Sequence, residues 1–121
     1  MPASGLMISN YGGVCVATFQ QPSLLDGPVI DAINGDLAKL VDEQAHRKLV
    51  LDFTSVRFLS SSMLGVLVSL RKKADTIKGE LVLVGLAADL MKVFTVSRLD
   101  SLFQFAKNED EAFRLIGGKG Q

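Results

Sequence analysis

The sequence predicts an α/β domain built on a mixed, mostly parallel sheet that opens with a β-hairpin. Two observations carry this prediction. Apolar segments of strand length alternate with segments whose apolar residues recur at helical spacing, which is typical of parallel strands joined by right-handed crossovers. The first two apolar segments are instead joined by a short turn that contains two glycines, and such turns favour an antiparallel hairpin.

The hairpin is predicted over residues 6–10 and 14–19, on either side of Gly12 and Gly13. A helix is predicted over residues 28–44, with Asp26 as its cap and Pro28 in its first turn, where a missing donor costs nothing. Its core face should consist of the apolar residues at helical spacing, namely Ile30, Ile33, Leu37, Leu40 and Val41.

The second half continues the alternation. Residues 48–53 are almost unbroken in apolar character, which indicates a strand covered on both faces. A helix over residues 60–76 follows, and its predicted core stripe is Met63, Val66, Leu67, Leu70 and Ala74. The remaining predicted elements are a strand at 80–84, a helix at 87–97, a strand at 102–106 and a helix at 109–116.

Length and composition predict one domain over residues 1–121, with a core at about 6–116 and a flexible tail at 117–121. Lys and Arg together number 13, as do Asp and Glu, so no net field favours nucleic acid or an anionic membrane. No apolar run reaches the roughly 18 residues of a membrane span, and residues 1–5 do not resemble the start of a secretory signal. We therefore expect a cytoplasmic protein.

The residues offer little for catalysis, and we expect neither an enzyme nor a cofactor. The single histidine, His46, follows a helix in a polar stretch and is interpreted as solvated, so no serine has an evident base. The single cysteine, Cys15, is interpreted as a small buried hydrophobe rather than a reactive thiol. Carboxylates show no metal-ligand spacing; Asp52 could orient the following loop or bind an ion, and solvating the loop is the favoured interpretation.

Three consecutive serines at a predicted helix start are the most informative motif. Ser60 is interpreted as the N-cap, because a serine hydroxyl accepts from the backbone N–H groups of the first turn. This leaves Ser61 and Ser62 available on the surface, beside unpaired N–H groups and the positive end of the helix dipole. Hydroxyls in such a place are suited to being bound or phosphorylated by another protein.

A candidate docking surface is predicted on the same helix. A projection at about 100° per residue turns Ser61, Leu64, Gly65 and Val68 roughly away from the core stripe. Leu64 and Val68 would then form a small apolar patch that another backbone approaches closely over Gly65. The equally weighted alternative is that Leu64 and Val68 pack on a neighbouring helix of the same domain.

The segment Phe58-Leu59-Ser60-Ser61-Ser62-Met63-Leu64-Gly65 resembles the Phe-Met-Asp-Ser-Ser-Gly-Leu-Gly motif of the STAS domain family, the anti-sigma factor antagonists and their relatives. The similarity extends over about residues 6–116 and includes the order of elements. It implies a mixed sheet with helices mainly on one side.

The resemblance also implies a mechanism, called partner switching. The unmodified antagonist binds an anti-sigma factor that is also a serine kinase of the GHKL type, phosphorylation of the loop serine ends that binding, and a serine phosphatase restores it. The motif aligns the phosphoacceptor with Ser62, with Ser61 as the alternative. The implied partner-binding residues are Ser60, Ser61, Ser62, Leu64, Gly65 and Val68.

Two positions depart from the motif: Ser60 replaces its aspartate and Met63 replaces the glycine after the second serine. These departures favour an alternative function, a STAS interaction module that is not phosphorylated. Such a module would act within a larger assembly, for example a stressosome-like scaffold or a lipid-transport complex.

Overall fold

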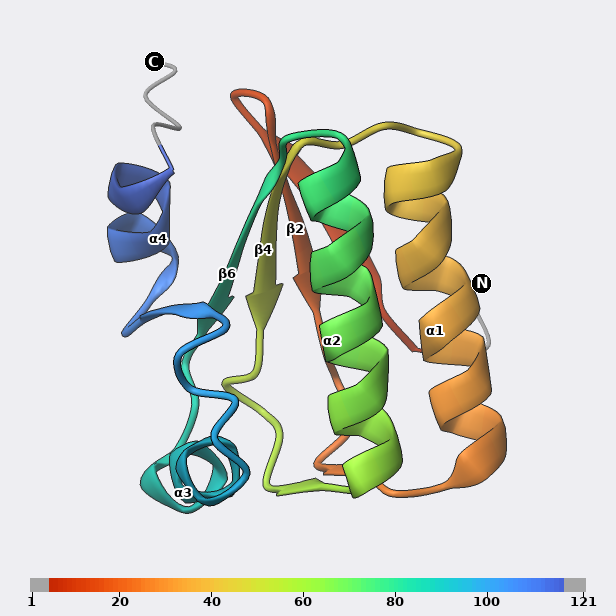
Figure 1. Cartoon of the computed structure of the whole chain (residues 1–121), viewed down its shortest axis with the longest axis vertical. Helices are drawn as coiled ribbons and strands as arrows, with labels where there is room; N and C mark the ends of the chain where they lie inside the picture. Colours follow the sequence, from red (N-terminus) through yellow and green to blue (C-terminus); the bar gives the residue numbers. More distant parts are fainter. Residues whose placement is uncertain (1–4, 117–121) are drawn as a thin grey trace.

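The computed structural model describes residues 5–116, and the predicted flexible tail at 117–121 lies outside them. The main sheet has five strands in the order β1-β2-β4-β6-β7 (Figure 1). Only β1 runs antiparallel to its neighbour; β2, β4, β6 and β7 are parallel. Their bounds are Met7–Tyr11 (β1), Val14–Thr18 (β2), Lys48–Asp52 (β4), Glu80–Val84 (β6) and Gln104–Ala106 (β7).

The helices cover both faces of the sheet unequally. The long helices α1 (Gly27–Asp42) and α2 (Ser61–Thr76) lie side by side on one face, whereas α4 (Glu109–Leu115) lies on the other (Figure 1). The short helix α3 (Ala88–Val96) lies near the carboxyl ends of the strands. The predicted fold class, with its opening hairpin and mostly parallel sheet, is confirmed.

The central strands are apolar throughout because each face meets a different layer. In β4, Leu49 and Leu51 belong to the large core beneath α1 and α2, and Val50 belongs to a smaller core beneath α4. A strand has a side-chain period of two, so successive residues must satisfy both layers. This explains why β4 and β6 lack the alternation of a half-exposed strand.

The predicted cap of α1 is confirmed, and the end of α2 is fixed by its backbone conformation. Asp26 caps α1, where its carboxylate accepts from the Val29 amide at 3.3 Å, and Pro28 lies in the first turn. The end of α2 is marked by Lys78 with φ 56° and by Gly79, which has no space for a side chain because an added Cβ would lie 2.8 Å from the Arg47 carbonyl oxygen.

Two short strands were not predicted. β3 (Ser23–Leu24) and β5 (Phe58–Leu59) fall in segments to which the sequence assigned no strand, and they pair in parallel as a separate two-stranded sheet. Two residues carry too little periodicity to indicate a strand, and the pairing partners are far apart in sequence. The last strand also begins at Gln104 rather than at residue 102.

Candidate functional site

The serine loop is held by the small sheet of β3 and β5. The amides of Arg57 and Phe58 both donate to the Pro22 carbonyl, at 2.7 and 3.0 Å, and the Ser60 amide donates to the Leu24 carbonyl at 3.1 Å. These bonds attach the loop before α2 to the segment before α1. The first turn of α2 is therefore fixed relative to α1.

Ser60 caps α2, as predicted. Its backbone is extended, with φ −88° and ψ 165°, and its hydroxyl accepts from the Met63 amide at 3.2 Å. Its carbonyl accepts from the Leu64 amide at 3.1 Å. The Ser60 hydroxyl is thus occupied in satisfying the helix terminus.

Ser61 and Ser62 are exposed on the first turn of α2. Their amides precede the first intrahelical hydrogen bond, so they add to the positive end of a 16-residue helix. The first turn contains no acidic residue that would offset this potential. The positive potential at this helix start favours the binding or attachment of an anionic group.

The predicted outward position of Leu64 is wrong. Leu64 is 7% exposed and belongs to the large core, while Val68 is half-buried and packs against that core. The reason is that α2 packs against α1 as well as the sheet, so its buried arc is wider than one stripe. Both residues therefore pack within the domain rather than facing outward, and Val66, predicted as core, is only half-buried.

Two other predictions for α2 agree with the structure. Met63 is fully buried, so its replacement of the motif glycine adds no bulk to the surface. Gly65 is exposed, and a Cβ added there would meet no heavy atom within 4 Å. The surface over Gly65 is open to close approach by another backbone.

The apolar surface next to the serine loop comes from two residues that were not predicted, Leu25 and Phe58. Phe58, in β5, is 59% exposed, and Leu25, which directly follows β3, is 54% exposed. They line a groove of about 270 Å³ together with Arg57, Leu59, Asp89, Leu90 and Val93. No sequence pattern pointed to these two residues, because the neighbouring Leu24 and Val56 are equally apolar and are buried.

Asp52 orients the start of the loop after β4. Its carboxylate accepts from the Thr54 amide at 2.9 Å and from the Thr54 hydroxyl. Glu109, at the start of α4, is hydrogen-bonded to Asp52. That hydrogen bond, burial and the nearby charges of Asp52 and Asp110 raise the pKa of Glu109 to about 7.

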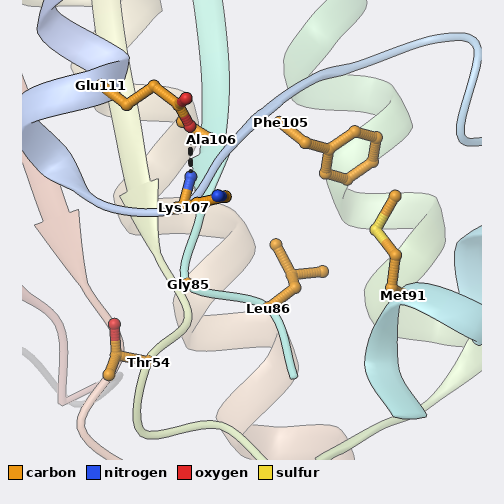
Figure 2. A pocket seen from close by; sticks show the side chains of 8 residues that line it. All are labelled: Thr54, Gly85, Leu86, Met91, Phe105, Ala106, Lys107 and Glu111. Carbon is orange, nitrogen blue, oxygen red and sulfur yellow. Dashed lines mark hydrogen bonds between the residues drawn. The ribbon is translucent and has the colours of Figure 1, made fainter. Parts of the chain in front are cut away.

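A larger cavity, of about 510 Å³, opens at the carboxyl ends of β4, β6 and β7. Figure 2 shows Leu86, Met91 and Phe105 gathered at one end, and Glu111 accepting a hydrogen bond from the Lys107 amide, at 2.7 Å, at the other. None of the three serines lines it, and no sequence motif pointed to it. Its remaining lining residues are Thr54, Gly85, Ala106 and Lys107.

His46 and Cys15, the single histidine and the single cysteine, both lie outside the serine loop. His46 follows the far end of α1, where its side chain is hydrogen-bonded to Gln44 at 3.1 Å. Cys15 is fully buried in β2, and burial raises the pKa of its thiol to about 11. Within residues 5–116, no group of three or more His, Cys, Asp or Glu side chains could hold a metal ion.

Across the same residues, no helix is both long and apolar enough to cross a membrane.

Comparison with known proteins identifies the family. A model of the STAS domain matches residues 6–112, and the chain belongs to this family. A Bordetella bronchiseptica protein, BtrV, which is described as an anti-sigma factor antagonist, is 28% identical over 107 residues, covering 88% of this chain and 90% of that protein.

Solved structures share the fold. An anti-sigma factor antagonist from Mycobacterium paratuberculosis has a TM-score of 0.81 at 20% identity, covering 93% of this chain and 92% of that one. The Bacillus cell fate determinant SpoIIAA in its phosphorylated form has a TM-score of 0.71 at 18% identity, covering 91% and 98% of the two chains. The resemblance inferred from the serine motif is confirmed at the level of family and fold.

Proposed function

We propose that this STAS domain is an anti-sigma factor antagonist that binds an anti-sigma factor with serine kinase activity and is released by phosphorylation of Ser62. One observation carries the proposal. Ser62 is exposed on the first turn of α2, and the loop before that turn carries the exposed ring of Phe58 and pairs with the segment that ends in Leu25. The names of BtrV and of the solved antagonists support the choice of partner.

The docking surface in this proposal differs from the predicted one. Leu25 and Phe58 supply its apolar contacts, in place of Leu64 and Val68, and Gly65 supplies a place of close approach. Exposed apolar side chains beside an open helix turn are typical of a surface that another protein covers. The hydroxyls of Ser61 and Ser62 would lie at the edge of that contact.

Phosphorylation would act against the complex and not against the fold. A phosphate adds about −1.5 to −2 charges and strong acceptor oxygens. In the free domain, the unpaired amides and the dipole of α2 accommodate this charge. Under a bound protein the same group must be desolvated and adds bulk, so the modified form loses affinity.

The family motif selects Ser62 among the three serines, and the capping role of Ser60 makes that residue the least suitable. Ser60 is disfavoured because its hydroxyl accepts the capping bond from the Met63 amide, which modification would disturb. Ser62 aligns with the phosphoacceptor of the family motif, and Ser61 remains the alternative. One of the solved structures with this fold is a phosphorylated protein, which supports modification of such a domain.

The direct test is incubation of the chain with its partner kinase of the GHKL type and ATP, followed by mass mapping. We expect one phosphate on Ser62, absent from Ser62→Ala and retained in the matched variants Ser61→Ala and Ser55→Ala. The cognate serine phosphatase should remove it. An active kinase that leaves both Ser61 and Ser62 unmodified would rule out the switch.

A second candidate function is favoured by one observation. Ser60 caps α2 with a hydroxyl where the family motif has a carboxylate, so the loop lacks an acidic group beside Ser62. We infer from this a competing role as a STAS interaction module without phosphorylation, in a stressosome-like scaffold or a lipid-transport complex. Affinity capture distinguishes the roles: a GHKL kinase supports switching, and transporter subunits or other STAS proteins support the module.

A further inference from the structure

Within residues 5–116, β1 is the end strand of the main sheet, and no other described strand pairs with its outer side. Gly12 and Gly13 have φ values of 54° and 88°, which are those of a two-residue type I′ turn, so Tyr11 and Val14 form the hydrogen-bonded pair that closes the hairpin. Hydrogen-bonded pairs alternate along an antiparallel ladder, and the next ones are Ser9 with Val16 and Met7 with Thr18. The backbone N–H and C=O groups of Ile8 and Asn10 therefore point away from β2.

This edge lacks the usual protection against pairing. Proteins protect edge strands by making them short, by placing Lys or Pro in them, or by covering them. The opposite edge, β7, has only three residues, whereas β1 has five and contains neither a charged residue nor proline. Its apolar side chains are exposed as well, at 51% for Met7, 40% for Ile8 and 52% for Tyr11.

We propose that two copies of this chain pair through their β1 strands, antiparallel and about a two-fold axis at Ser9, so that their sheets become continuous. In this register Ile8 lies opposite Asn10 of the second copy, and each such pair exchanges two backbone hydrogen bonds. The two-fold axis generates a second, equivalent pair, in which Asn10 lies opposite Ile8 of the second copy. The outward N–H and C=O groups of both residues are therefore hydrogen-bonded in both copies.

The side chains of β1 are complementary to themselves under this two-fold axis. Met7 lies opposite Tyr11 of the second copy in a non-hydrogen-bonded pair, where side chains approach closely. Sulfur beside an aromatic ring is a favourable contact, and the Tyr11 ring is already positioned by Phe113 at a centroid distance of 6.0 Å. Ser9 lies on the axis, opposite Ser9 of the second copy, so the two side chains that approach most closely there are small and uncharged.

A second copy fits this edge better than an unrelated strand because the side chains of β1 match one another under the two-fold axis. An apolar groove of about 190 Å³ also lies between β1 and α1, and its lining residues are Leu6, Ile8, Asp36, Lys39, Leu40 and Gln44. The serine loop follows β4, in the middle of the sheet, so this pairing does not depend on the function of Ser62.

Sedimentation equilibrium of the full chain over a series of concentrations tests the pairing. We expect a reversible monomer–dimer equilibrium. Met7→Lys and Tyr11→Glu should each raise the dimer dissociation constant by roughly tenfold or more, because each change occurs twice per dimer. The double variant Met7→Lys/Tyr11→Glu should recover dimerisation. In this variant the lysine at position 7 of each copy lies opposite the glutamate at position 11 of the other copy, whereas the two charges within one chain are four residues apart.

The matched control is Val96→Lys, which replaces an exposed apolar residue on α3 and should leave the equilibrium unchanged. Oxidation of Ser9→Cys provides a second readout, because opposed residues in a non-hydrogen-bonded pair lie within disulfide range. We expect a disulfide-linked dimer for Ser9→Cys and none for Ser55→Cys, an exposed loop position. A wild-type monomer at all concentrations, or a dimer insensitive to both charge variants, would overturn the proposal.

Discussion

The amide of Ser60 donates a hydrogen bond to the carbonyl of Leu24, with 3.1 Å between nitrogen and oxygen. This bond joins the loop that carries the serines to the segment that leads into α1, and it places two chain segments distant in sequence on one surface. The proposed docking surface is therefore composite: the modifiable hydroxyls come from α2, and the exposed apolar side chains come from both segments.

The first prediction concerns the apolar part of this surface. Phe58→Ser and Leu25→Ser should each lower the affinity for the anti-sigma partner by roughly tenfold or more, about 1.4 kcal/mol, because exposed apolar side chains supply the contact. Stability should change little, since both side chains are more than half exposed. Isothermal titration calorimetry measures the affinity, and Val96→Ser is the control. Unchanged affinity in both variants would exclude this surface as the docking site.

The second prediction uses two glycines in similar positions. Gly65 in α2 and Gly35 in α1 are both exposed, and an added Cβ would meet no heavy atom within 4 Å at either. Alanine should therefore stabilise the protein by about 0.5–1 kcal/mol at each position, through helix propensity. Only Gly65→Ala should weaken partner binding, because close approach is required there and not over α1. Thermal unfolding and calorimetry on the two variants separate these effects.

The main sheet, the four helices and part of the site could be predicted from the sequence. Element order followed from periodicity, and the roles of Asp26 and Ser60 followed from capping chemistry, which is local. The position of Leu64 could not be predicted in this way, because a single-stripe projection ignores the second packing partner of α2. The exposure of Leu25 and Phe58 depends on the pairing of β3 with β5, a contact between distant segments that leaves no periodic pattern.

The third prediction concerns the cap of α2. Ser60→Ala should destabilise the protein by about 1 kcal/mol, because the Met63 amide loses its acceptor. Ser60→Asp should retain the cap and add a favourable charge at the helix start, so its stability should equal or exceed that of the wild type. Urea unfolding measures both.

Ser60→Asp also tests whether the replacement of the motif aspartate by Ser60 limits phosphorylation of Ser62. If the missing carboxylate limits modification, Ser60→Asp should increase the rate of Ser62 phosphorylation by the partner kinase. If Ser62 is phosphorylated equally fast in the wild type and in Ser60→Asp, the hydroxyl of Ser60 is sufficient for recognition by the kinase.

The fourth prediction concerns pH and the pairing of Glu109 with Asp52. The pKa of Glu109 is raised from 4.5 to about 7 in the folded protein, chiefly by its hydrogen bond with Asp52, so the folded state holds a proton that the unfolded chain releases. Its stabilising contribution is complete below pH 4.5 and is lost as the pH rises through 7. The free energy of unfolding should therefore decline across this interval and level off above it.

Glu109→Gln should remove this component, because an amide keeps a donor for Asp52 and does not ionise. Its stability should vary less between pH 5 and pH 8 than that of the wild type, and at pH 8 it should be the more stable of the two. Glu43→Gln, at the exposed end of α1, is the matched control and should keep the wild-type slope. Urea unfolding across the interval gives each slope, and equal slopes for Glu109→Gln and the wild type would show that Glu109 ionises normally beside Asp52.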